Sequence, residues 1–169
     1  MKVGLIADTH DRLDACTELL RRLQEGGATL IFHAGDFCSP FALLPFIEAG
    51  TPLMGVFGRN DGDPEGIRAI AERGIGFELW ESPHSFEVGG KRILLVHEIA
   101  DATETSLNTH QFVVQGHLHR QEMKEREGAV VICPGEGCGW LHGSPGAALL
   151  DLDTGKVEFI QLPASEWQR

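Results

Sequence analysis

The chain opens with the stretch Lys2-Val3-Gly4-Leu5-Ile6-Ala7-Asp8-Thr9-His10, an apolar run that leads into two polar side chains able to bind a metal. The run predicts a β-strand over residues 2–7. The same pattern returns along the chain, where each short apolar run is followed by potential ligands. The repeats are residues 30–32 before Gly35-Asp36, 53–57 before Gly58-Arg59-Asn60-Asp61, 93–96 before His97, and 112–114 before Gly116-His117-Leu118-His119.

The position of these polar residues predicts a binding site. Open α/β sheets bind ligands at the carboxyl ends of their strands, so these segments are expected to meet there. If the strand geometry continues past Ala7, Asp8 and His10 point the same way, and the same holds for His117 and His119. Carboxylate and imidazole ligands together suit Mn²⁺, Fe or Zn²⁺ better than Mg²⁺ or Ca²⁺.

The order of predicted elements indicates an α/β fold in two halves. Helices over residues 13–24, 41–48 and 64–73 alternate with strands in the first half, which favours a mostly parallel sheet. The second half is rich in short strands and contains a Gly89-Gly90 hairpin signal and a helix over residues 103–108. The strands predicted for this half are 77–80, 85–88, 91–96, 112–115, 121–126, 130–133, 147–151 and 157–160. Two sheets packed face to face, with helices outside, would bury both sets of strands. From its length, the chain is expected to form one domain over residues 1–169.

The charge balance excludes some partners. With 25 acidic and 14 basic residues, the formal net charge is −11, which argues against binding a nucleic-acid polymer. A small phosphate ester remains a suitable ligand because divalent cations reverse the local field. No apolar run reaches the roughly 20 residues that cross a bilayer, and the N-terminus lacks the core of a signal peptide. We therefore predict a cytoplasmic protein with no membrane partner.

The remaining reactive side chains point to structural roles. The four cysteines form no Cys-x-x-Cys pair and are expected to be small buried residues, although Cys38 could lie near the site. We expect His33 to be a core or ligand-supporting residue, and His84, His110 and His142 to be surface or loop residues. Glu98 is interpreted as a solvated acid rather than a ligand. No serine-nucleophile or phosphate-loop motif is present, which leaves metal-assisted hydrolysis as the chemistry that these residues support.

Taken in order, the motifs resemble those of the calcineurin-like metallophosphoesterase superfamily, and most closely its small prokaryotic phosphodiesterase branch. The family signature is Asp-x-His, Gly-Asp, Gly-Asn-x-Asp or Gly-Asn-His, a single His, and Gly-His-x-His. Residues 33–37 and 134–145 also look like segments of that branch, so the resemblance covers nearly the whole chain. It implies a four-layer α/β/β/α sandwich of two mixed β-sheets with flanking helices.

The resemblance also implies a function and a set of ligands. It implies a metal-dependent phosphoesterase that hydrolyses small phosphodiesters through a metal-bridging hydroxide. Two divalent ions are expected, with Mn favoured over Zn, Fe or Ni. By position in the motifs, Asp8, His10 and His119 would hold one ion, His97 and His117 the other, and Asp36 would bridge both.

One position departs from the family pattern. Arg59 stands where the family has a ligand Asn, and Asn60 follows it. Three outcomes are open: Asn60 takes the ligand role, the second ion binds weakly, or Arg59 holds the substrate phosphate. The second is slightly favoured. Arg59, Asn60 and Asp61 are thus candidate catalytic or substrate-binding residues, and Glu98, where the family commonly has Gly, could balance the charge of Arg59.

Asn60 also occupies the place of a catalytic His found in many phosphatases of the family. We therefore expect water or a metal-bound group to protonate the leaving group. The alternative functions are a scaffold that kept the fold and lost the chemistry, as in a eukaryotic retromer subunit that resembles this fold, and a phosphomonoesterase or dinucleotide-polyphosphate hydrolase. The apolar segment 41–47 is a candidate homo-oligomer contact, although a core-facing helix is favoured.

Overall fold

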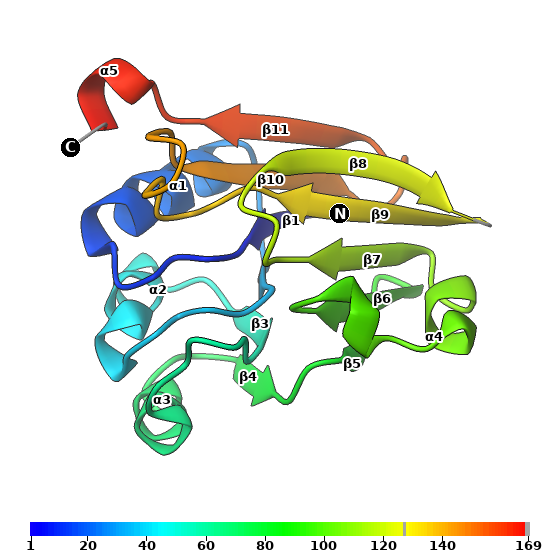
Figure 1. The fold of residues 1–169 in the computed structure, drawn as a ribbon, viewed down its shortest axis with the longest axis horizontal. Helices are drawn as coiled ribbons and strands as arrows, with labels where there is room; N and C mark the ends of the chain where they lie inside the picture. Colours follow the sequence, from blue (N-terminus) through cyan, green and yellow to red (C-terminus); the bar gives the residue numbers. More distant parts are fainter. Residues whose placement is uncertain (127, 168–169) are drawn as a thin grey trace.

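A computed structural model describes residues 1–126 and 128–167 and contains two mixed β-sheets that face each other (Figure 1). The first sheet has the strand order β11-β10-β1-β2-β3-β4. Strands β1 to β4 run parallel to one another, whereas β10 and β11 are antiparallel to their neighbours. These strands span Lys2–Ile6 (β1), Ile31–His33 (β2), Leu53–Val56 (β3), Phe77–Trp80 (β4), Gly146–Asp151 (β10) and Val157–Gln161 (β11).

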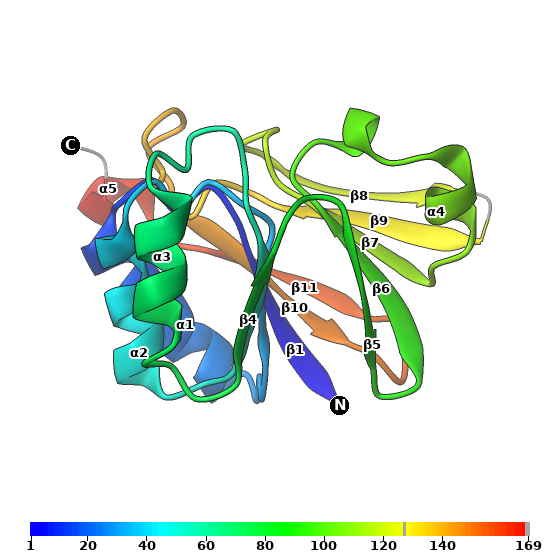
Figure 2. The same cartoon turned by 90° about the horizontal axis from the view of Figure 1, so that it is seen from below.

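The second sheet has the order β5-β6-β7-β9-β8, with a parallel centre and antiparallel edges. Its strands span His84–Val88 (β5), Lys91–Val96 (β6), Phe112–Gln115 (β7), Gln121–Arg126 (β8) and Ala129–Pro134 (β9). The inner faces of the two sheets form one core, in which side chains such as Leu5, Phe32, Ile93 and Val114 are buried. This packing fixes the carboxyl ends of β1, β2, β3, β6 and β7 along one edge of the molecule (Figure 2).

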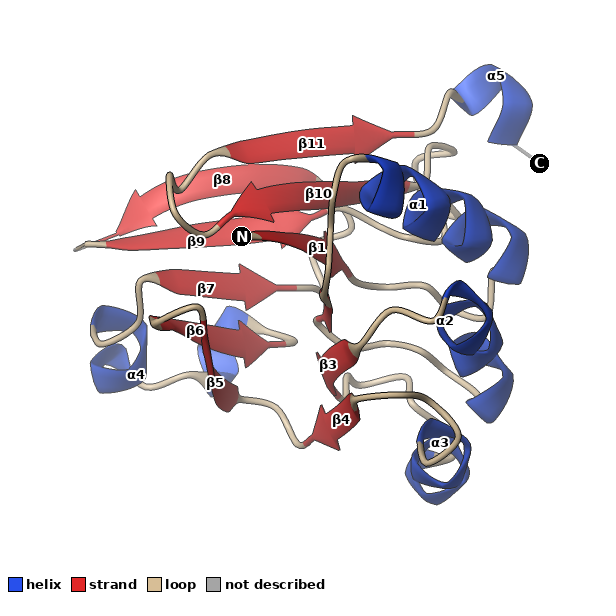
Figure 3. Ribbon diagram, turned by 180° about the vertical axis from the view of Figure 1, so that it is seen from behind, coloured by secondary structure: helices blue, strands red, loops and turns tan. Residues whose placement is uncertain are grey.

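Helices cover the outer faces and complete the predicted four layers (Figure 3). Against the first sheet pack α1 (Leu13–Glu25), the 3₁₀-helix η1 (Pro40–Leu43), α2 (Leu44–Ala49) and α3 (Pro64–Ala71). Among the residues that the structure describes, the second sheet carries the 3₁₀-helix η2 (Ile99–Asp101) and the five-residue α4 (Glu104–Asn108), so its outer layer is thin. A last short helix, α5, spans Ala164–Trp167. The predicted α/β/β/α sandwich is confirmed.

Local sequence explains why these helices form. In α1, Cys16, Leu19 and Leu23 recur at helical spacing and are buried against the first sheet. In α3, the Asp63 side chain caps the first turn by accepting a hydrogen bond from the Gly66 N–H. The predicted break at Pro45 is a change from η1 to α2, in whose first turn Pro45 lies. Among the described residues, no helix is both long and apolar enough to cross a membrane.

Several expectations about individual side chains are tested by the fold. Cys16, Cys133 and Cys138 are buried as expected, whereas Cys38 is only partly buried. His84 was expected in a loop or on the surface, but it begins β5, is half-buried and stacks on Trp80. His110 lies in a loop but is buried, because its ring binds the Ser85 hydroxyl at 2.7 Å and the Ser106 carbonyl at 2.6 Å.

The segment 41–47 packs mainly inward. Leu43 and Phe46 are buried in the core between α1, α2 and the first sheet, which agrees with the favoured core-facing interpretation. Phe41 is the exception and leaves 67% of its surface exposed.

Candidate metal centre

The expected ligands lie on loops that leave the same edge of the two sheets. The loops after β1, β2, β3, β6 and β7 meet there, and the loop after β9 joins them (Figure 2). Each loop contributes at least one of the residues that the sequence singled out. Asp8, Asp36 and His97 are 1% exposed or less, whereas the ring of His117 lies at the surface.

Backbone geometry at these residues differs from the strand geometry expected from the sequence. Strand β1 ends at Ile6, and Asp8 and His10 adopt left-handed conformations with φ of 52° and 38°. Asp36, His117 and His119 do the same, with φ of 61°, 67° and 55°. The condition that the strand geometry continues past Ala7 is therefore not met. Tight turns bring these side chains together instead, at a cost of about 1–3 kcal/mol per residue that the surrounding structure must offset.

Hydrogen bonds between neighbouring loops hold these turns in place. The Asp8 N–H donates to the Gly35 carbonyl at 3.0 Å, and the His10 N–H donates to the Asp36 carbonyl at 3.1 Å. From the other side, the Cys138 N–H donates to the Asp8 carbonyl at 3.0 Å. The loops after β1, β2 and β9 are thus tied into one unit that positions the ligands before any ion binds.

Four ligand atoms form a compact set. The donor atoms of Asp8, His10, Asp36 and His119 all lie within 4.8 Å of one another. The His119 Nε2 is 3.6 Å from the Asp8 Oδ1, and the His10 Nε2 is 3.5 Å from the Asp36 Oδ2. Two carboxylates and two imidazoles at this spacing suit one transition-metal ion.

Asp36 connects this set to a second histidine. Its Oδ2 is 3.5 Å from the His10 Nε2 and 3.4 Å from the His97 Nε2, so one carboxylate oxygen lies between two imidazoles. The His97 and His117 rings are neighbours, with centroids 5.5 Å apart. Asp36 therefore has the position that a bridging carboxylate requires.

The histidine tautomers fit metal binding. His97 donates its Nδ1 proton to the Ala34 carbonyl at 2.9 Å, which leaves Nε2 with a free lone pair. The Nδ1 of His10 is 3.1 Å from the Cys38 sulfur, and the Nδ1 of His119 is 3.0 Å from the Glu136 Oε2. The Nε2 atoms of His10 and His97 are buried without any hydrogen-bond partner among the described residues. An imidazole that binds a cation needs a free lone pair on one ring nitrogen and a hydrogen bond that fixes the other ring nitrogen. In these histidines the free lone pairs are buried beside carboxylates.

Burial also adjusts the protonation of this site. Burial raises the pKa of Asp8 to about 7, whereas the Coulombic interaction with His119 and the hydrogen bond from the His117 N–H act to lower it. Burial lowers the pKa of His10, which keeps the ring neutral and able to bind a cation. For Asp36, burial raises the pKa, but two hydrogen bonds from Asn60 outweigh it and the net pKa is lowered. Divalent ions at this site would supply positive charge that stabilises the ionised form of these buried carboxylates.

The second half of the site is more open. Asn60 donates from its backbone N–H to the Asp36 Oδ1 at 2.8 Å and from its Nδ2 to the Asp36 Oδ2 at 2.7 Å. Arg59 is 54% exposed and donates to Glu98 at 2.7 Å and Asp101 at 3.2 Å, and the Glu98 Oε2 is itself 4.0 Å from the His117 Nε2. Glu98 is therefore part of an ion pair rather than a solvated acid, and it balances Arg59 as the sequence suggested.

Two other residues of the motifs support the loops. Asp61 accepts hydrogen bonds from the Cys38 N–H at 2.8 Å and the Gly58 N–H at 2.6 Å, so its carboxylate joins two ligand loops. His33 is fully buried, stacks on Phe37, and bonds the Thr9 hydroxyl at 3.0 Å. Its supporting role matches the expectation from the sequence.

Sequence reasoning missed Glu136 and Cys138. Glu136 is buried and accepts hydrogen bonds from the His119 Nδ1, the Leu141 N–H at 3.0 Å and the His142 N–H at 2.6 Å. The Cys138 sulfur lies within 4.8 Å of donor atoms of His10 and His119. Both residues follow the end of β9, so the same strand-end rule that identified the other ligand loops could have pointed to them.

Comparisons with known proteins agree with this geometry. The sequence profile of the calcineurin-like phosphoesterase superfamily domain matches residues 1–155. A phosphodiesterase of Methanocaldococcus jannaschii is 28% identical over 96% of this chain and 98% of its own. A probable metallophosphoesterase of Methanothermobacter thermautotrophicus is 27% identical over 94% of this chain and 90% of its own.

The solved structure of an archaeal phosphodiesterase has the same fold, with a TM-score of 0.87 and 25% sequence identity, covering 96% of this chain and all of that one. The resemblance to the small prokaryotic branch is confirmed. The chain therefore belongs to the calcineurin-like phosphoesterase superfamily, and its reaction class is metal-dependent hydrolysis of phosphate esters.

Proposed function

We propose that the protein is a phosphodiesterase that uses two divalent cations and acts on small phosphodiesters. The observation that carries this proposal is the position of the Asp36 Oδ2, at 3.5 and 3.4 Å from the unpartnered Nε2 atoms of His10 and His97. The names of the archaeal relatives support diester rather than monoester substrates. Mn²⁺ is the favoured ion because the ligand set mixes carboxylate and imidazole.

The ligands divide between two ions that share one carboxylate. Asp8, His10 and His119 would hold the first ion, His97 and His117 would hold the second, and Asp36 would lie between them. Bound cations lower the pKa of a water molecule and neutralise charge on the phosphoryl oxygens. The two Asn60 hydrogen bonds fix the orientation of the bridging carboxylate.

The leaving group receives its proton from solvent in this proposal. Asn60 stands in the place of the catalytic His of other family members and has no proton to transfer at neutral pH. The ring of His117, at the mouth of the site, serves as a ligand. We therefore expect kcat/KM to depend steeply on the pKa of the leaving group. A flat dependence, with chemistry shown to be rate-limiting, would contradict this part of the proposal.

Metal stoichiometry and turnover test the proposal together. Protein as purified, and again after Mn²⁺ loading and gel filtration, is analysed for metal content and assayed with bis(p-nitrophenyl) phosphate. We expect turnover that is lost in Asp36→Asn and His97→Ala and kept in Glu158→Gln, a matched change on the exposed strand β11.

The metal content separates the remaining alternatives. Two ions per chain support the bridged site, and one ion supports a second site weakened by the replacement of the ligand Asn by Arg59. No bound metal and no turnover with any divalent ion would reject the enzyme and favour the scaffold.

A further inference from the structure

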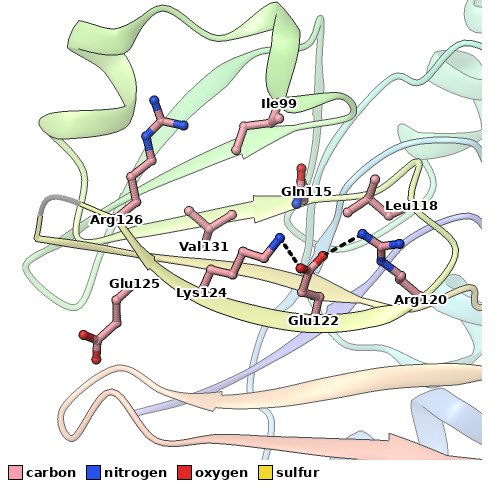
Figure 4. A pocket seen from close by; sticks show the side chains of 9 residues that line it. All are labelled: Ile99, Gln115, Leu118, Arg120, Glu122, Lys124, Glu125, Arg126 and Val131. Atoms are coloured by element: carbon pink, nitrogen blue, oxygen red, sulfur yellow. Dashed lines mark hydrogen bonds and ion pairs between the residues drawn. The ribbon is translucent and has the colours of Figure 1, made fainter.

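A groove of ≈ 580 Å³ lies on the outer face of the second sheet (Figure 4). It is bounded on one side by η2 and on the other by the outward face of β8. The thin outer layer accounts for it, because α4 covers only part of this face. The size of the groove falls in the usual range for small-ligand sites, about 300–1,000 Å³.

The groove borders the ligand loops directly. Leu118, which lines it, stands between the ligands His117 and His119 in the sequence. Arg120, which follows His119, and Ile99, which follows Glu98, also line it. A substrate whose phosphate lies at the metal centre can therefore extend one of its two ester groups into this groove.

The lining combines an apolar surface with paired charges. Ile99, Leu118 and Val131 supply the apolar part, which suits a planar or aliphatic group. At the other side, Glu122 binds both Lys124 and Arg120, the latter at 3.3 Å (Figure 4). One carboxylate thus lies between two cations, and about two-thirds of each cation's side chain is exposed, at 66% for Lys124 and 64% for Arg120.

The charge of these two cations is opposite to the net charge of the chain. The protein carries a net charge of −11, so most of its surface repels an anion. Glu122 can balance only one of the two cations that it contacts. Glu125 also lines the groove, but its carboxylate points to the opposite side from the Lys124 amine (Figure 4). An anionic group that approaches Lys124 and Arg120 therefore meets two cations and the single carboxylate of Glu122, next to an apolar wall.

We propose that this groove binds the non-reacting half of a nucleotide-like diester, with its base against Ile99, Leu118 and Val131 and a second phosphate at Lys124 and Arg120. The proposal rests on the phosphodiesterase function proposed above and adds a substrate class to it. Arginine and lysine are both suited to phosphate, since each donates several charge-assisted hydrogen bonds.

Two substrates that differ in one group test the proposal. They are thymidine 5′-(p-nitrophenyl phosphate) and the same compound with a 3′-phosphate, and the measured quantity is the ratio of their kcat/KM values. Wild-type protein is expected to prefer the 3′-phosphorylated compound. Lys124→Met should lower that preference about tenfold, because it removes a charged partner of the phosphate.

Glu122→Gln should change the preference in the opposite direction, because it releases both cations from their shared carboxylate. A merely destabilised groove would lower the preference in both variants, so the opposite signs are diagnostic. Lys91→Met is the matched control, since Lys91 begins β6 at the end of that strand opposite His97. It should leave the preference unchanged.

Binding of thymidine 3′,5′-bisphosphate, measured by titration calorimetry, separates this proposal from the proposed activity. If neither substrate is hydrolysed, the proposed phosphodiesterase activity is rejected. The proposed ligand of the groove is still supported if Lys124→Met weakens bisphosphate binding and Glu122→Gln strengthens it. An unchanged preference, or bisphosphate binding that ignores both variants, would overturn the assignment of the groove.

Discussion

Glu136 offers a sharp test of how the metal centre is preorganised. Its carboxylate accepts hydrogen bonds from the His119 Nδ1, from the backbone N–H groups of Leu141 and His142, and from the Cys138 thiol at 3.8 Å. Burial raises the pKa of this carboxyl, but the His119, Leu141 and His142 donors outweigh it and the net pKa is lowered. The charged carboxylate thus fixes the proton of His119 on Nδ1 and leaves Nε2 for a cation.

Glu136→Ala removes the acceptor of all these hydrogen bonds at once. Loss of a carboxylate that supports a metal-binding His typically weakens metal affinity 10–100-fold, which corresponds to about 1.4–2.8 kcal/mol. The two backbone N–H groups left without an acceptor would cost about 1–3 kcal/mol each in folding stability. In Glu136→Gln, the amide oxygen can take the place of Oε2 and keep the His119 and Leu141 bonds, so only the charge and the His142 bond are lost. We expect Glu136→Gln to lie between wild type and Glu136→Ala.

Mn²⁺ affinity is measured by competition with a chromogenic chelator, and stability by calorimetry of the metal-free protein. Glu158→Ala, on exposed β11, is the control and should change neither quantity. Metal-free Glu136→Ala that is folded and binds Mn²⁺ as tightly as wild type would refute the role of Glu136 in orienting His119.

Three further changes test other parts of the structure. Gly58→Ala would place a Cβ 2.2 Å from the Asp36 Oδ1, so we expect tight Mn²⁺ binding to be lost, and retention of two bound ions would contradict that contact. Arg59→Asn restores the amide found in the family and should raise the Mn²⁺ content after gel filtration; an equal content would show that Arg59 does not limit the second site. Glu18→Gln should lower the free energy of unfolding by at most about 1 kcal/mol at pH 7, because the ion pairs of Glu18 with Arg21 and Arg22 lie near the surface. Arg21 and Arg22 lower the pKa of Glu18 from 4.5 to about 2, so this loss should shrink as the pH falls between those values, and a loss that persists at pH 2 in denaturant titrations would reject the ion pair as its cause.

The elements of the fold could be predicted because each has a local cause. Helix α1 follows from apolar residues at helical spacing, and the β5–β6 hairpin follows from Gly89-Gly90 between two short apolar runs. The predicted ends differ from the observed ones by one or two residues in most elements, as expected where helices fray and strands meet loops. The short elements η2 and α5 were missed because three or four residues are too few for a periodic pattern.

The site was partly predictable for a different reason. Which residues meet follows from strand ends, but how they meet depends on contacts between loops that are distant in the sequence. Asp8 adopts a left-handed conformation because its backbone is bonded to the loops after β2 and β9, at Gly35 and Cys138. Asp and His tolerate this conformation better than branched residues do, yet nothing in their spacing requires it.

Arg59 and Asn60 occupy the part of the third motif in which the family has its ligand Asn. The Arg59 guanidinium pairs with Glu98, and the Asn60 amide pairs with Asp36. The Asn60 Nδ2 donates at 2.7 Å to the same Asp36 oxygen that faces both His10 and His97. A second cation must compete with that hydrogen bond, and a hydrogen bond to a charged group contributes about 1.5–3 kcal/mol. Because the first ion has three other expected ligands in Asp8, His10 and His119, we expect this competition to weaken the second ion more than the first.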